Sequence, residues 1–70
     1  MHNPEPLWTA QKGRVVIRAT LRNKGALGWE VVLLVDDQPW GGPFYGTRAE
    51  AITEAHAYWN ALQKKDWSSV

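Results

Sequence analysis

The stretch from residue 28 to residue 38 constrains this chain most, because it contains five consecutive apolar residues, Val31 to Val35. Three of the five are β-branched valines, which fit a pleated surface, and the unbroken run indicates a strand that is partly covered on both faces. A helix is disfavoured, since the run is short and lies between a glycine and a proline. The sequence therefore predicts that residues 28–38 form the central strand of a small sheet.

Residues 13–22 alternate between two kinds of side chain, as a half-buried strand does. One side carries Val15, Ile17, Ala19 and Leu21, and the other carries Arg14, Val16, Arg18, Thr20 and Arg22. The glycine-bearing segment 23–28 predicts an antiparallel hairpin between this strand and the central one. We expect the arginine face to include Glu30, Val32, Leu34 and Asp36, and the core face to include Trp29, Val31, Leu33 and Val35.

The C-terminal half of the chain predicts one helix. Residues 47–50 have the pattern of a capping box, in which the Thr47 hydroxyl accepts from the backbone N–H of Glu50. The helix is expected to end near Lys65, with an apolar stripe formed by Ile52, Ala55, Trp59 and Leu62 and flanked by Ala51 and Tyr58. Residues 36–43 are rich in turn formers and are expected to form no regular element, whereas residues 44–46 are expected to form a short third strand. The predicted fold class is α+β, a three-stranded antiparallel sheet (β-β-β) with one C-terminal α-helix packed on one face.

Seventy residues are enough for one small domain. We expect residues 1–12 to form a flexible N-terminal arm, residues 13–65 a single β-β-β-α domain and residues 66–70 a C-terminal tail. Leu7 to Thr9 could dock on the domain or add a short edge strand with Trp8 as the anchor, and Trp67 could fold back. A domain of this size without cysteine is marginally stable, and with an uncovered sheet face we expect it to form a homodimer.

Catalysis and cofactor binding find little support in the sequence. There is no cysteine, and the helical neighbours of His56 include no carboxylate that could orient its imidazole. Asp36 and Asp37 lack the further oxygen donors of a calcium loop, so turn formation explains them better. We therefore expect a protein that is not an enzyme and that needs no metal and no other cofactor.

The charges are unevenly distributed along the chain. Residues 1–35 hold five Lys and Arg against two Glu, whereas residues 36–70 hold three Lys and Arg against five Asp and Glu. Arg14, Arg18 and Arg22 recur every fourth residue, so we expect a basic row on one strand face. Such a row is typical of phosphate contacts, and a solvated face paired with Glu30 would give the same pattern. The predicted nucleic-acid site comprises Arg14, Arg18, Arg22, Lys24 and Trp40.

An alternative function is that of a small protein-binding regulator or inhibitor of the kind that phages and plasmids encode, for example an anti-CRISPR protein. The predicted protein interface is an apolar and aromatic patch made of Val16, Val32, Leu34, Trp40 and Phe44. Residues 1–10 do not resemble a signal peptide, and no run approaches the roughly 20 apolar residues of a membrane span. We expect a cytoplasmic protein whose partner is a nucleic acid or another protein, not a membrane.

The segment 44–51, Phe-Tyr-Gly-Thr-Arg-Ala-Glu-Ala, looks like the strand-to-helix junction of several small β-β-β-α modules. These include the arm-type DNA-binding domains of phage integrases and the second half of double-stranded-RNA-binding domains. The resemblance covers about half of the chain. It departs from the RNA-binding family in lacking an N-terminal helix and in having only Arg48 where that family has a lysine cluster. It implies that a sheet face opposite a helix can serve as a nucleic-acid surface.

Overall fold

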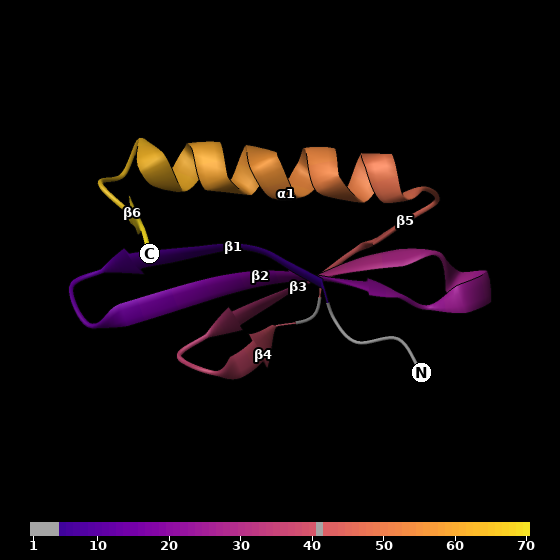
Figure 1. Cartoon of the computed structure of the whole chain (residues 1–70), viewed down its shortest axis with the longest axis horizontal. Helices are drawn as coiled ribbons and strands as arrows, with labels where there is room; N and C mark the ends of the chain where they lie inside the picture. The colour runs from indigo at the N-terminus through magenta and orange to yellow at the C-terminus, as the bar shows by residue number, and fades with distance from the viewer. Residues whose placement is uncertain (1–4, 41) are drawn as a thin grey trace.

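A single helix lies along one face of an antiparallel sheet in the computed structural model, which describes residues 5–40 and 42–70 (Figure 1). The sheet order is β4-β3-β2-β1-β6, and β5 also pairs with β3. The elements are β1 (Glu5–Lys12), β2 (Val15–Asn23), a 3-10 turn (Gly25–Leu27), β3 (Trp29–Val35), β4 (Gln38–Trp40), β5 (Phe44–Tyr45), α1 (Arg48–Gln63) and β6 (Ser68–Ser69). The α+β class is confirmed, but the prediction of three strands is wrong.

The largest correction concerns the expected N-terminal arm. Residues 5–12 form β1, which pairs with β2 from Glu5↔Leu21 to Lys12↔Val15. The register shifts between Pro6 and Trp8, so the extra residue there bends the strand at its proline end. Pairing with β2 supplies the backbone partners that this segment lacks as an isolated extended peptide. Residues 1–4 of the expected arm lie outside the described residues.

Two tight turns set the register of β1 with β2 and of β3 with β4. Gly13 has φ 61°, the conformation that the first position of a type II′ turn requires, and Arg14 completes this two-residue connection between β1 and β2. Asp36 and Asp37 have φ 49° and 67°, as in a type I′ turn, and they join β3 to β4. The expectation that three arginines form a continuous row on one strand is therefore wrong, because Arg14 lies in a turn and β2 begins at Val15.

Residues 38–40 form β4, which corrects the expectation that residues 36–43 contain no regular element. Pro39 is tolerated because it faces Leu34, one position beyond the pair that closes the turn, where its nitrogen points away from β3. After β4 the pairing with β3 is interrupted, and it resumes at β5, which pairs with the start of β3. Gly42 lies in this interruption, where a Cβ atom would collide with the carbonyl oxygen of Val31.

The core between helix and sheet is built largely from small residues. Ala10, Ala19, Ala51 and Ala55 are fully buried, and Leu21 and Val31 are the largest side chains that are almost completely buried. Alanines on both surfaces let α1 lie close to the sheet. Trp8 packs on Trp59 with ring centroids 5.8 Å apart, and its Nε1 donates to the carbonyl oxygen of Ala55 at 2.9 Å. The expected role of Trp8 as an anchor is confirmed.

The helix begins and ends close to where the sequence predicts. The Thr47 hydroxyl accepts from the backbone N–H of Glu50 at 3.1 Å, which confirms the predicted N-cap. After α1 the chain reverses through Asp66, and Ser68–Ser69 forms β6 against Ala10 and Gln11. Residues 68 and 69 of the expected C-terminal tail are therefore part of the sheet. No helix in residues 5–40 and 42–70 is both long enough and apolar enough to cross a membrane.

Candidate nucleic-acid interface

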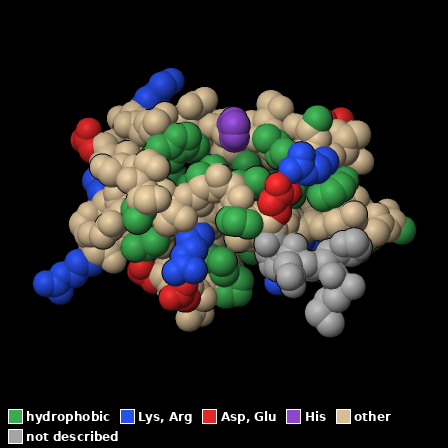
Figure 2. Space-filling model, in the orientation of Figure 1, with side chains coloured by type: hydrophobic (Ala, Val, Ile, Leu, Met, Phe, Trp, Pro, Cys, Tyr) green, Lys and Arg blue, Asp and Glu red, His purple; other side chains and the backbone are tan. Residues whose placement is uncertain are grey.

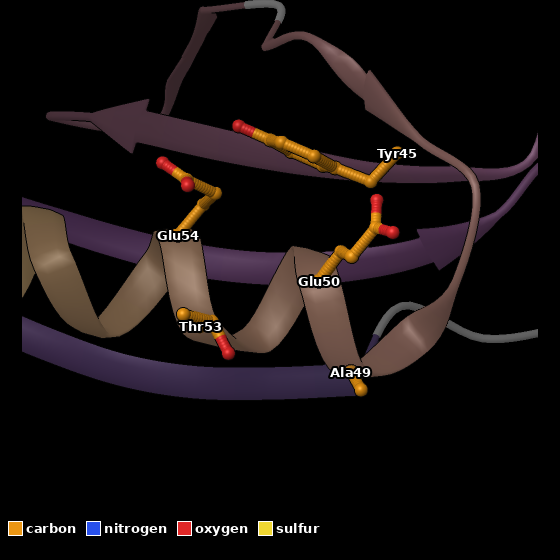
Figure 3. Close-up of a pocket in the computed structure, with 5 residues that line it drawn as sticks. All are labelled: Tyr45, Ala49, Glu50, Thr53 and Glu54. Atoms are coloured by element: carbon orange, nitrogen blue, oxygen red, sulfur yellow. The ribbon is translucent and has the colours of Figure 1, made fainter.

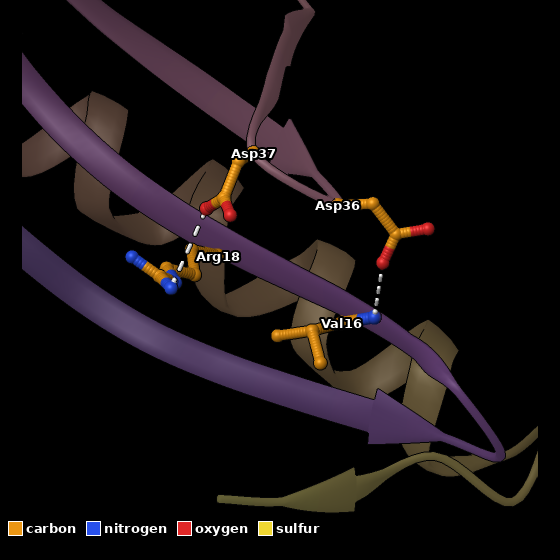
Figure 4. Close-up of polar contacts among 4 residues, drawn as sticks. All are labelled: Val16, Arg18, Asp36 and Asp37. Atoms are coloured by element: carbon orange, nitrogen blue, oxygen red, sulfur yellow. Dashed lines mark hydrogen bonds and ion pairs between the residues drawn. The ribbon is translucent and has the colours of Figure 1, made fainter.

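The face of the sheet opposite α1 carries the two arginines of β2. Arg18 pairs across the sheet with Leu34 on β3 and Thr9 on β1, and Arg22 pairs with Glu30. Residues on the other parity, Ala19 and Leu21, are buried under the helix, so the predicted assignment of faces for β2 is confirmed. Figure 4 views this face, with α1 behind the strands.

Arg18 forms an ion pair on this face. Its guanidinium Nη2 lies 3.4 Å from Oδ1 of Asp37, and both side chains are more than half exposed. The two residues, with Val16 and Asp36, line a shallow hollow of about 200 Å³ (Figure 4). Glu30 is the acidic partner that the sequence suggests for the arginine face, whereas Arg18 pairs with a residue of the β3–β4 turn. An exposed pair of this kind contributes only about 0.2–1 kcal/mol, so another anion can replace the carboxylate.

Asp36 has a structural role next to this pair. Its carboxylate Oδ1 accepts from the backbone N–H of Val16 at 3.1 Å, and its own N–H donates to the Val16 carbonyl at 2.9 Å. Both bonds hold the β3–β4 turn against the start of β2. The interpretation of Asp36 as a turn residue is thereby supported.

The other predicted basic residues lie at the two ends of β2. Arg22 is exposed beside Glu30, and Lys24 is exposed just before the 3-10 turn. Arg14 is exposed in the turn at the opposite end. Among the residues that the structure describes, the ion pairs are Arg18 with Asp37 and Arg48 with Glu5. The guanidinium of Arg22 therefore forms no ion pair within the described part of the chain.

The side chain of Trp40 leaves the backbone on the helix side of the sheet, opposite the arginines. It pairs with Leu33, which packs against the core cluster under the helix, so the Cβ of Trp40 points to the helix side. Its side chain is 63% exposed, as expected. The structure thus separates Trp40 from the arginines with which the sequence analysis grouped it, because the two-residue turn fixes the register of β4.

The predicted apolar patch is also divided by this register. Val16, Val32, Leu34 and Phe44 lie on the helix-free face with Arg18 and Arg22, whereas Trp40 does not. Val32 is only 8% exposed, and Val16 and Leu34 are half-buried. Phe44, which pairs with Glu30, is 48% exposed and is the most exposed of these four apolar side chains.

A second hollow, which the sequence does not predict, lies between α1 and β5. It has a volume of about 380 Å³ and is lined by Tyr45, Ala49, Glu50, Thr53 and Glu54 (Figure 3). Glu50 and Glu54 project from successive turns of the helix toward the Tyr45 ring. Burial raises the pKa of the Tyr45 hydroxyl above its ordinary value, and Tyr58 and Glu54 add to this effect. The spacing of the two glutamates was the available signal, but nothing in the sequence placed Tyr45 beside them.

The comparisons with known proteins leave the interface to be interpreted from its own geometry. A scan against protein-family models, a search of curated proteins and a search of solved structures each found no match to this chain.

Proposed function

We propose that this chain is a small nucleic-acid-binding module that contacts phosphates with the helix-free face of its sheet. The observation that carries the proposal is the position of Arg18 and Arg22. Both are exposed, both lie on a sheet face that no described helix covers, and the strand holds them roughly 13 Å apart. Arg14 in the β1–β2 turn and Lys24 after β2 add exposed positive charge beyond the two ends of the strand.

Two acidic residues partly offset the positive charge of this face. Asp37 pairs with Arg18, and Glu30 lies opposite Arg22. Neither makes the face unfit for phosphates, because exposed ion pairs are weak and an arginine guanidinium can donate two hydrogen bonds to a phosphate in place of a single contact with a carboxylate. Contacts of this kind recognise the backbone and not the bases, so we expect binding that is weak and largely insensitive to sequence.

The salt dependence of binding tests the proposal directly. Each phosphate neutralised on duplex DNA contributes about −0.9 to the slope of log K against log salt concentration. We expect Arg18→Ala and Arg22→Ala each to make this slope less steep by about 0.9, measured by fluorescence anisotropy on a labelled duplex of mixed sequence. Absence of binding by the unmodified protein at low salt would overturn the proposal.

A control variant with the same loss of charge is available on the helix side. Arg48 forms its ion pair with Glu5 at the start of α1, away from the helix-free face. Arg48→Ala should leave the slope unchanged. If it lowers the slope as much as Arg18→Ala does, the effect reflects overall charge and not this face.

Phe44 favours a second candidate function, which is binding of a protein partner. An exposed phenylalanine on a sheet face that no described helix covers is a suitable anchor for an apolar contact, including one with a second copy of the chain. Such binding would change little with salt, whereas phosphate binding weakens steeply. A homodimer through this face is part of this alternative, and a single 7.9 kDa species in sedimentation at high micromolar concentration would exclude it.

A cytoplasmic location belongs to the same proposal, since a non-specific nucleic-acid ligand would be encountered there. We propose no catalytic step, because the described residues of the helix-free face include no nucleophile paired with a base.

A further inference from the structure

Phe44 and Arg22 lie in one row across the helix-free face of the sheet. Both pair with Glu30 of β3, Arg22 from β2 on one side and Phe44 from β5 on the other, so the three side chains leave the sheet in the same direction. Two strand spacings place the backbones of Arg22 and Phe44 about 10 Å apart. Both side chains are exposed. An aromatic ring and a guanidinium are therefore available to one ligand.

The surface between Arg22 and Arg18 is largely apolar. Thr20 lies between them on β2, and its hydroxyl donates to the backbone carbonyl oxygen of Val32 at 3.3 Å, so its donor is already used. Val32, the residue paired with Thr20, is only 8% exposed. Figure 2 shows a mixture of this kind over the strands below the helix, where hydrophobic side chains reach the surface next to Lys and Arg side chains. The helix-free face therefore combines cations with apolar and aromatic surface.

A single strand can use this combination, whereas a duplex cannot. The bases of a duplex are paired and stacked inside it, so a sheet face meets its phosphates and sugars. An unpaired strand also presents the flat faces of its bases, and proteins that bind single strands stack these bases on aromatic side chains beside basic residues. Stacking tolerates any base, so it agrees with binding that is largely insensitive to sequence.

Glu30 favours a base over a phosphate in the row of Phe44 and Arg22. Its carboxylate lies between the two side chains and is half-buried, and it repels a phosphate placed above it. The same carboxylate can accept a hydrogen bond from a base amino group. Phosphates are then expected on the β2 side of the row. Arg18 and Arg22 are roughly 13 Å apart, a span of about four nucleotides at the roughly 3.4 Å of a stacked strand.

We infer that the helix-free face binds a single-stranded nucleic acid, with one base stacked on Phe44 and phosphates on Arg22 and Arg18. This inference rests on the proposed function and deepens it by naming the ligand class and a residue that contacts a base. DNA and RNA share the base faces and the phosphates, so the inference covers single strands of both.

The experiment compares Phe44→Leu and Phe44→Tyr with the unmodified protein on labelled 12-nucleotide probes, by fluorescence anisotropy at constant low salt. The probes are single strands of one mixed sequence as DNA and as RNA, the DNA duplex, and an abasic DNA strand with the same phosphates. We expect Phe44→Leu to weaken binding of the single strands by at least about fivefold, the lower limit for one lost base stack, and to leave the abasic strand and the duplex unchanged. Phe44→Tyr should keep the affinity, because its ring still stacks.

Trp40→Leu is the matched control, since it removes an exposed aromatic ring from the helix side of the sheet. It should leave the binding of every probe unchanged. Circular dichroism checks that all variants remain folded, which the exposed position of Phe44 favours.

The outcomes separate this inference from the proposed function. If Arg22→Ala makes the salt slope on the duplex less steep while Phe44→Leu binds single strands as tightly as the unmodified protein, the inferred ligand class is wrong and the proposed function stands. If Phe44→Leu weakens the abasic strand as much as the strands with bases, or Phe44→Tyr loses as much affinity as Phe44→Leu, no base stacks on the ring and the inference is overturned. If the unmodified protein binds none of the probes, both the proposed function and this inference fail.

Discussion

Arg18 on β2 and Asp37 in the β3–β4 turn form an ion pair at 3.4 Å, so the most central arginine of the helix-free face is partly neutralised by the protein itself. Any phosphate that reaches Arg18 must compete with this carboxylate. If the face binds phosphates as proposed, removing the Asp37 carboxylate should raise its affinity and removing Arg18 should lower it.

Asp37→Asn should strengthen duplex binding at low salt, by up to about fivefold, because an exposed ion pair contributes no more than about 1 kcal/mol. Asparagine tolerates the positive φ of 67° at this turn position, so the β3–β4 turn should persist. Anisotropy titrations measure the change. Glu5→Gln is the matched control, since it releases Arg48 on the helix side and should leave affinity unchanged. Equal gains in both variants would show that only net charge matters.

Trp59→Ala should destabilise the domain by roughly 2–4 kcal/mol, whereas Trp40→Ala should cost little. Trp59 is half-buried and packs on Trp8, and its loss removes both the buried area and the aromatic pair. Trp40 is 63% exposed on a short edge strand. Thermal unfolding followed by circular dichroism measures which of the two variants loses more stability. A larger loss for Trp40→Ala would mean that the edge strand carries more of the core than its exposure indicates.

Gly42→Ala should destabilise the fold by about 1–3 kcal/mol, because the new Cβ would meet the carbonyl oxygen of Val31 and the backbone would have to move. Gly46→Ala is the control, since no atom lies within 4 Å of a Cβ built there. Urea unfolding of both variants measures the difference. Similar midpoints would show that the segment between β4 and β5 shifts without cost.

The ionisation of Tyr45 should depend on Glu54. The chain has two tyrosines, so in Tyr58→Phe the absorbance change on ionisation reports Tyr45 alone. Adding Glu54→Gln should lower the pKa of Tyr45, because the negative carboxylate that disfavours the phenolate is gone. An unchanged or raised pKa in the double variant would contradict the arrangement in Figure 3.

The same pKa shift predicts a pH dependence of stability. The folded pKa of Tyr45 lies above its ordinary value of 10.0, so between the two values the folded chain keeps a proton that the unfolded chain has lost. The free energy of unfolding should therefore fall as pH rises from about 10 through the raised pKa. Glu54→Gln should reduce this fall, which urea titrations at several alkaline pH values can measure.

Local patterns in the sequence were sufficient for the parts of the fold that depend on neighbouring residues. The alternation along β2 predicted which side chains face the helix, because a strand has a period of two in any sheet. Thr47 predicted the start of α1, since an N-cap bond spans only three residues. The placement of Arg18 and Arg22 on the face away from the helix followed from the same alternation.

Tertiary structure decided the remainder, because it depends on pairings between distant residues. The sequence before Trp8 contains prolines and reads as an arm, yet pairing with β2 makes it a strand. Trp40 lies on the helix side only because Asp36 and Asp37 form a two-residue turn, and one residue more or fewer would move it to the other face. The Lys12 ammonium reaches the carbonyl oxygen of Lys65, 53 positions away, only because α1 packs on the sheet.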